Sequence, residues 1–170
     1  IIDEADIIVF TGSVPTGQEI AAAAAKNLVP TTLELGGKSP NIVFDDADLD
    51  RAVTGAVAGI FAAGGQTCIA GSRLLVQESV YERVVEAVAA RAADIRLGDP
   101  TLPETHMGPV ANRPQYDRIQ QAITAGIETG ARVVTGADDV TDPALESGLF
   151  VRPTVFADVD NTTHLARAEI

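Results

Sequence analysis

The chain contains one cysteine, Cys68, and glycines and small residues surround it in the segment 64–73 (GGQTCIAGSR). A lone cysteine is usually an inert, small apolar residue of a core. Here the neighbouring glycines remove Cβ bulk, so a planar substrate or cofactor could pack against the backbone, and the Cys68 N–H stays available to an oxyanion. A thiolate suits attack on a carbonyl, because the thiohemiacetal formed from an aldehyde can lose a hydride and leave a thioester that is still reactive. Cys68 is therefore a candidate nucleophile.

A glutamate, Glu34, lies between two leucines in the segment 33–40 (LELGGKSP), near the carboxyl end of a predicted strand. Open α/β sheets bind their ligands at that end of their strands, and partial burial there would make the carboxylate a usable general base. The alternative is a glutamate on a solvated edge, or an ion pair with Lys38. Sequence spacing alone does not place Glu34 beside Cys68.

The segment 12–17 (GSVPTG) lies between a predicted strand and a predicted helix. Free backbone N–H groups and the positive end of a helix dipole suit a phosphate, and Ser13 adds a hydroxyl. The segment lacks the lysine of a P-loop and does not match G-x-G-x-x-G, and most such turns only cap a helix. Gly12 and Ser13 are therefore either a phosphate site or a plain capped turn.

The residue types argue against a metal site. The alternating acids Asp46, Asp48 and Asp50 resemble the start of a calcium loop, but Arg51 stands where that loop needs a glycine. Asp48 is better explained as the cap of a helix. One cysteine and two histidines do not supply a clustered zinc site, and we expect no metal.

Composition and charge exclude several classes of protein. The 170 residues are 46% hydrophobic and 21% charged, which is typical of a folded globular chain. A net charge of -12 does not attract nucleic acid or anionic membranes, and a single cysteine cannot form an internal disulfide. There is no signal-peptide pattern and no run of about 18 apolar residues, so we expect a cytoplasmic protein.

Strand-like and helix-like segments alternate along the chain. The predicted strands are 7–10, 31–35, 41–44, 73–77, 132–135, 150–152 and 154–157, and the predicted helices are 19–27, 49–63, 79–93 and 114–129. The first 36 residues read as one βαβ unit with parallel strands. The order predicts the α/β class, with a mainly parallel sheet and flanking helices.

Taken in order, these motifs resemble the aldehyde dehydrogenase superfamily. The resemblance rests on the segments 10–17, 33–40, 65–73, 98–100, 107–109, 148–155 and 166–170, and it spans almost the whole chain. Each motif alone is weakly specific, whereas the ordered series is very specific.

The resemblance implies NAD- or NADP-dependent oxidation of a small-molecule aldehyde to a carboxylic acid. Cys68 matches the nucleophile, with its N–H as half of the oxyanion hole, and Glu34 matches the base that activates the hydrolytic water. The other matches concern the cofactor: Gly12 and Ser13 meet the pyrophosphate, Leu35 and Gly36 line the nicotinamide pocket, and Glu169 holds the nicotinamide ribose. Only the resemblance supports the role of Glu169.

The resemblance also implies a domain organisation. Residues 1–36 would be the last βαβ part of the dinucleotide-binding domain, and residues 37–170 a catalytic domain incomplete at its C-terminus. Family subunits are about three times this length, and the chain begins without Met and stops in mid-pattern, so we expect a truncated, aldehyde dehydrogenase-like fragment of a homo-oligomeric enzyme, a dimer or tetramer. Val14 and Pro15 replace an expected polar pair, and a proline is acceptable in the first helical turn.

Two other functions remain open. Cys68 and Glu34 could serve a cysteine-dependent acyl hydrolase or transferase that uses no nicotinamide, or the chain could be a non-catalytic α/β fragment. The aldehyde, the choice between NAD and NADP, and the choice between hydrolysis and coenzyme-A-dependent acyl release are not determined by these residues.

Overall fold

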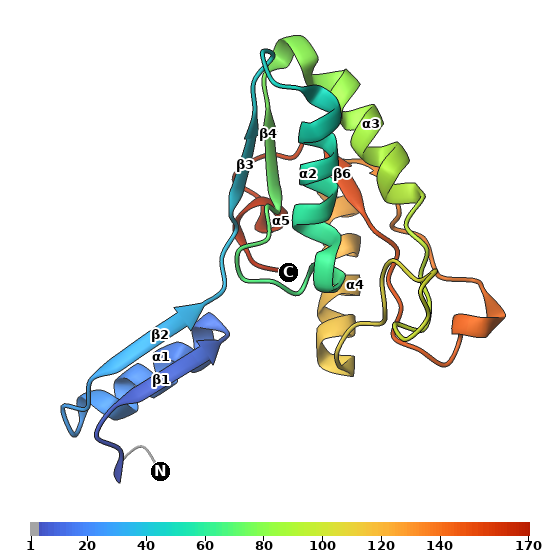
Figure 1. The fold of residues 1–170 in the computed structure, drawn as a ribbon. Coiled ribbons are helices and arrows are strands. Elements are labelled where there is room, and N and C mark those ends of the chain that lie inside the picture. The colour runs from blue at the N-terminus through green and yellow to red at the C-terminus, as the bar shows by residue number, and fades with distance from the viewer. Residues whose placement is uncertain (1–3) are drawn as a thin grey trace. The chain divides into compact units, whose positions relative to one another are not determined.

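The computed structural model describes residues 4–170, and the chain divides into two compact units, Ile1–Gly37 and Lys38–Ile170 (Figure 1). The first unit consists of strand β1 (Ile8–Gly12), helix α1 (Val14–Ala25) and strand β2 (Thr31–Leu35). The two strands are parallel and run in register from the pair Ile8 and Thr31 to the pair Gly12 and Leu35. The predicted βαβ unit with parallel pairing is confirmed.

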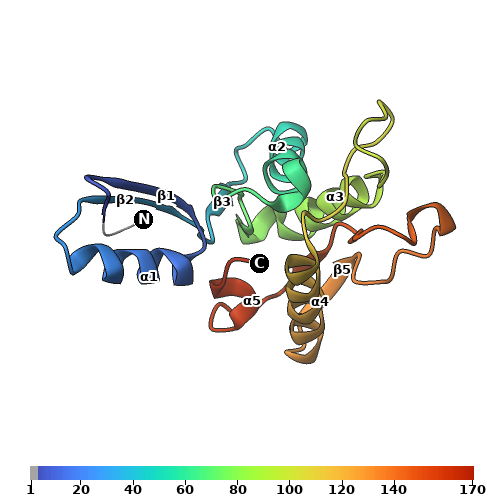
Figure 2. The ribbon, with the colours of Figure 1, turned by 90° about the horizontal axis from the view of Figure 1, so that it is seen from below.

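Helix α1 lies along one face of the β1–β2 sheet, as Figure 2 shows. Gly17 allows this packing, because a Cβ there would come within 2.6 Å of Leu35 Cδ2. The prediction that this helix spans 19–27 is wrong at its start. Ser13 caps the helix, and Pro15 presets a helical φ where its missing N–H costs no hydrogen bond, so the helix begins at Val14.

The second unit contains a parallel pair of strands, β3 (Pro40–Val43) and β4 (Arg73–Val76). Between them the chain forms α2 (Leu49–Phe61) and a 3-10 helix, η2 (Ala62–Gly65). The Asp48 side chain accepts a hydrogen bond from Arg51 N at 3.2 Å, so the predicted helix cap is confirmed. With two of the three strand pairs parallel, the predicted α/β class with mainly parallel pairing is also confirmed.

The remaining elements follow β4 in the same unit. They are η3 (Glu78–Val80), α3 (Tyr81–Ala93), α4 (Arg113–Glu128), β5 (Arg132–Thr135), η4 (Pro143–Leu145), β6 (Val155–Ala157) and α5 (His164–Arg167). Strands β5 and β6 are antiparallel. The predicted strand at 150–152 does not form. Pro153 has no N–H to donate to a ladder, and Leu149 O accepts a hydrogen bond from Val110 N, in the loop before α4, at 2.9 Å.

The core of the second unit lies between the β3–β4 pair and helices α2 and α3, which pack side by side (Figure 1). Its buried members are Val43, Val53, Ala56, Val80, Val84 and Val88. The predicted apolar face of the third helix, which also includes Ala92, is buried. Each fully buried valine contributes about 1.5–3 kcal/mol relative to an exposed one.

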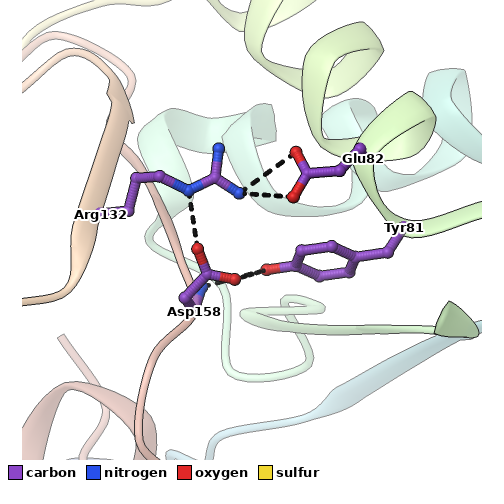
Figure 3. Close-up of polar contacts among 4 residues, drawn as sticks. All are labelled: Tyr81, Glu82, Arg132 and Asp158. Atoms are coloured by element: carbon purple, nitrogen blue, oxygen red, sulfur yellow. Dashed lines mark hydrogen bonds and ion pairs between the residues drawn. The ribbon is translucent and has the colours of Figure 1, made fainter.

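A polar cluster on the surface joins the start of α3 to the β5–β6 pair (Figure 3). Arg132 Nε donates to Asp158 Oδ2 at 2.7 Å, and Arg132 Nη2 lies 3.1 Å from Glu82 Oε1. Tyr81 Oη donates to Asp158 Oδ1 at 2.8 Å and accepts from Asp158 N at 3.0 Å. We call these four residues the Arg132 cluster. The hydrogen bond from Arg132, followed by that from Tyr81, holds the pKa of Asp158 below its ordinary value.

Candidate functional site

The first unit brings five of the predicted site residues to one end of its sheet. In the parallel register Thr11 pairs with Glu34 and Gly12 pairs with Leu35, and Ser13 and Gly36 come next along the chain. This is the carboxyl end of both strands, where open α/β sheets bind ligands. The turn after β1 and the end of β2 therefore lie next to each other.

The turn between β1 and α1 has the properties of an anion site and also of a helix cap. Ser13 Oγ accepts from Thr16 N at 3.4 Å and lies 3.0 Å from Thr16 Oγ1. A Cβ on Gly12 would come within 2.5 Å of Phe10 Cζ, so the Phe10 ring would have to shift to admit a side chain there. The first turn of α1 carries no acid. Two hydroxyls and a helix dipole without a repelling carboxylate fit the pyrophosphate of a dinucleotide.

Glu34 and Leu35 have opposite orientations on β2. Leu35 packs against Gly17 of α1 and is half-buried, so the strand alternation places Glu34 on the other face of the sheet, where it is exposed. Within residues 4–170 the Glu34 carboxylate makes no hydrogen bond and no ion pair. The partial burial expected for Glu34 is not found, and its exposure matches the alternative of a glutamate on a solvated edge. Its action as a base stays a prediction.

Cys68 lies in the second unit, in a turn between η2 and β4, and its side chain is exposed. The turn closes with a hydrogen bond from Ala70 N to Thr67 O at 2.9 Å. Beyond it, Gly71 N donates to Gly59 O at 3.3 Å, and a Cβ on Gly71 would come within 3.1 Å of Asn41 Cβ. In the part of the chain that the structure describes, no hydrogen bond uses the Cys68 N–H. The thiol is accessible, and the N–H beside it is available to an oxyanion.

Glu169, the other predicted site residue of this unit, is exposed just after α5 and interacts electrostatically with Lys38 at the start of β3. Lys38 is held by its backbone, since Arg73 Nε donates to Lys38 O at 2.9 Å. Burial, and then the Arg73 guanidinium, lower the pKa of Lys38, and the Glu169 carboxylate opposes that shift. Sequence reasoning missed this electrostatic interaction, because nothing in the local pattern connects the two ends of the second unit.

Sequence reasoning also missed Gln66, two residues before Cys68. Its side-chain amide bonds to Ala63 O and to Ala111 N. The sequence feature that could have identified Gln66 is its position in the glycine-rich segment that carries the candidate nucleophile.

The predicted site residues are divided between the two units. Gly12, Ser13, Glu34, Leu35 and Gly36 belong to the first unit, and Cys68 and Glu169 belong to the second. A shared site of Glu34 and Cys68 would need residues of both units, and it stays a prediction.

Two further findings concern residues 4–170. No three His, Cys, Asp or Glu side chains in this range are grouped so that they could hold a metal ion. None of its helices combines the length and the hydropathy needed to cross a membrane.

Known proteins resemble this chain along almost its whole length. A sequence profile described as the aldehyde dehydrogenase family matches residues 2–170. An aldehyde dehydrogenase of Emericella nidulans is 48% identical over 166 residues, which are 97% of this chain and 33% of that protein. A betaine aldehyde dehydrogenase of Brucella ovis is 45% identical over 161 residues, 95% of this chain and 33% of that protein.

Solved structures show the same likeness. A mutant aldehyde dehydrogenase of Pseudomonas syringae, in complex with NAD+ and octanal, matches with a TM-score of 0.93 and 41% identity, over 98% of this chain and 34% of its own. A betaine aldehyde dehydrogenase of Staphylococcus aureus in complex with NAD+ matches with a TM-score of 0.96 and 38% identity. The match covers 98% of this chain and 33% of that structure's chain. The chain thus spans about a third of the length of the relatives it matches. A profile match to nearly every residue, with the motif series in order, shows that the chain belongs to the aldehyde dehydrogenase family.

Proposed function

We propose that this chain is the part of an NAD(P)-dependent aldehyde dehydrogenase that carries the nucleophile, the general base and part of the cofactor site. The observation that carries the proposal is the exposed Cys68 in a tight turn with an unused N–H, in a chain of this family. The NAD+ and octanal in the Pseudomonas syringae structure support a nicotinamide cofactor and an aldehyde substrate.

In the proposed reaction the Cys68 thiolate attacks the aldehyde carbon, forms a carbon–sulfur bond and pushes the carbonyl electrons onto oxygen. The Cys68 N–H donates a hydrogen bond to that oxyanion. When bound, NAD(P)+ supplies the acceptor for the hydride that the thiohemiacetal loses. A thioester on Cys68 remains.

Glu34 then takes a proton from a water molecule, whose oxygen attacks the thioester carbon and displaces the Cys68 sulfur. The products are a carboxylic acid, a reduced nicotinamide and a proton, and the thiolate is restored. The support is that Glu34 stands at the carboxyl end of β2, where open α/β sheets bind ligands, with no partner among residues 4–170. This favours hydrolysis over transfer of the acyl group to coenzyme A.

We assign the cofactor contacts to both units. Gly12 and Ser13 would meet the pyrophosphate at the start of α1, Leu35 and Gly36 would line the nicotinamide pocket, and Glu169 would hold the nicotinamide ribose. We further propose that residues 1–36 belong to the dinucleotide-binding domain and residues 37–170 to the catalytic domain. The enzyme would act in the cytoplasm as a dimer or tetramer.

The test measures reduced nicotinamide by absorbance, with octanal or betaine aldehyde and either NAD+ or NADP+, in the protein expressed from its complete reading frame. Cys68→Ala should lower turnover at least about 1,000-fold, because the proposed thioester forms on the Cys68 sulfur. Glu34→Gln should keep a first burst of reduced nicotinamide and slow steady turnover by about 100-fold or more, since only hydrolysis needs the base.

The controls separate this proposal from its alternatives. Gln121→Ala changes an exposed residue of α4 and should leave turnover unchanged. Ester cleavage without any aldehyde-dependent reduced nicotinamide would support the acyl hydrolase instead. The 170-residue chain by itself should show little or no turnover, because it has a third of the length of its relatives. A strong aldehyde-dependent signal from that chain would contradict this expectation.

A further inference from the structure

Gln66 links the turn that carries Cys68 to two other parts of the second unit. It follows η2 and precedes Cys68 by two residues. Its backbone N donates to Ala63 O at 3.2 Å, and its side-chain Nε2 donates to the same oxygen at 3.1 Å. Its Oε1 accepts from Ala111 N at 3.0 Å, across 45 positions of sequence. Both ends of the side-chain amide are therefore used.

The Ala111 end of this link is itself held in place. Val110 N donates to Leu149 O at 2.9 Å. Asn112 Oδ1 accepts from Gln115 N at 2.9 Å and so caps the 16-residue helix α4. Gln66 thus ties the Cys68 turn to a loop that is anchored on both sides of Ala111.

The Ala63 end lies in a segment that has an unfavourable conformation. Ala63, Gly64 and Gly65 have φ values of 51°, 65° and 76°, in the left-handed region. For an alanine this conformation costs about 1–2 kcal/mol, so surrounding contacts must maintain it. The two hydrogen bonds from Gln66 to Ala63 O are such contacts. A Cβ on Gly64 would come within 3.2 Å of Gln66 Nε2, so the side chain lies close against this segment.

We propose that Gln66 is a positioning residue for Cys68: its amide, bonded to Ala63 O and Ala111 N, fixes the turn so that the thiol occupies one place. This inference rests on the proposed function of Cys68 as the nucleophile. Its consequence for catalysis is large, because a displacement of about 1 Å in a reacting group lowers the rate about 100-fold.

The first experiment uses the 170-residue chain and measures hydrogen exchange of the Ala111 amide by NMR. The wild-type amide should be protected, and Gln66→Met, whose thioether is only a weak acceptor and donates nothing, should raise its exchange rate at least about tenfold. Gln121→Met removes an exposed glutamine from α4 and should leave the rate unchanged. An Ala111 amide that is unprotected, or unaffected by Gln66→Met, would overturn the proposal.

The second experiment measures turnover in the protein from the complete reading frame. Gln66→Met should lower kcat by about 10- to 100-fold, with the KM for the nicotinamide cofactor within about twofold of wild type. Gln66→Glu keeps an oxygen that can accept from Ala111 N, so it should restore Ala111 protection and part of kcat. If Gln66→Met loses the protection of the Ala111 amide but keeps the wild-type kcat, Gln66 has a structural role only.

A third measurement separates failure of this proposal from failure of the proposed function. Cys68 is the one thiol of the chain, so alkylation by iodoacetamide reports on it alone. Gln66→Met should raise the alkylation rate at least about threefold, because the released turn takes up more orientations, and Gln121→Met should not. If wild type oxidises no aldehyde, this change still supports the positioning role, and its absence refutes it.

Discussion

Ser72 stands four residues after Cys68, and its hydroxyl oxygen is buried without a hydrogen-bond partner among residues 4–170. A buried hydroxyl that makes no hydrogen bond has lost its contacts with water without compensation. Ser79 is a useful contrast, because its Oγ donates to Asp45 Oδ2 at 3.0 Å.

We predict that Ser72→Ala leaves the free energy of unfolding unchanged or raises it by up to about 1 kcal/mol, since no hydrogen bond is lost. Ser79→Ala should lower it by about 0.5–1 kcal/mol. Urea denaturation of both variants measures the difference. A larger loss in Ser72→Ala than in Ser79→Ala would mean that the Ser72 hydroxyl has a partner in solution.

The Arg132 cluster gives a prediction about pH. The pKa of Asp158 is lowered in the folded chain, mainly by the hydrogen bond from Arg132. Its carboxylate therefore stabilises the fold at any pH at which it is ionised in both the folded and the unfolded chain. That contribution is complete above the ordinary value of 3.8 and is lost as the pH falls through the lower folded pKa. The difference in unfolding free energy between wild type and Asp158→Asn should therefore be constant near neutral pH and shrink below about pH 4. A difference that grows as the pH falls would contradict this cause.

At the scale of secondary-structure elements, two glycines differ in the space that a side chain would find. Gly55 is inside α2, and a Cβ there would meet nothing within 4 Å. Gly136 follows β5 with a φ of 74°, and a Cβ there would come within 2.3 Å of Pro153 O. The first position is open to a side chain, and the second is closed by backbone on the neighbouring segment.

We predict that Gly55→Ala raises the free energy of unfolding by about 0.5–1 kcal/mol, because alanine restricts the unfolded chain and favours the helix. Gly136→Ala should lower it by at least about 2 kcal/mol, because it combines a strained φ with a clash against a backbone oxygen. Calorimetric melting of both variants tests the pair. Equal effects of the two substitutions would refute the explanation by local space.

At the scale of the whole chain, the buried core cluster belongs entirely to the second unit. The first unit, Ile1–Gly37, has one helix and two strands. Chains shorter than about 40 residues rarely fold without additional support. The two units should therefore differ in their ability to fold alone.

We predict that residues 38–170 expressed alone unfold cooperatively with nearly the same Tm as the full chain, since their core is complete within them. Residues 1–37 alone should show no cooperative transition. Circular dichroism melting of the two pieces makes the comparison. A disordered 38–170 piece would show that its core depends on the first unit.

Several features could be predicted from the sequence because they depend on neighbouring residues. The strand 31–35, the Asp48 cap and the apolar face of α3 follow from period-two alternation, a capping side chain and helical spacing, which are local properties. Cys68 and Glu34 were candidates from the residues that flank them, and the family followed from the order of the motifs.

Other features were decided only by the tertiary structure, because they depend on contacts between distant residues. The predicted strand at 150–152 was replaced by a segment bonded to the loop before α4, and the left-handed conformation at Ala63 gave no local signal, because alanine favours helices. The link from Gln66 to Ala111 spans 45 positions, and no local pattern records such a distance. Thus the sequence determined which residues could react, whereas folding decided which residues hold them in place.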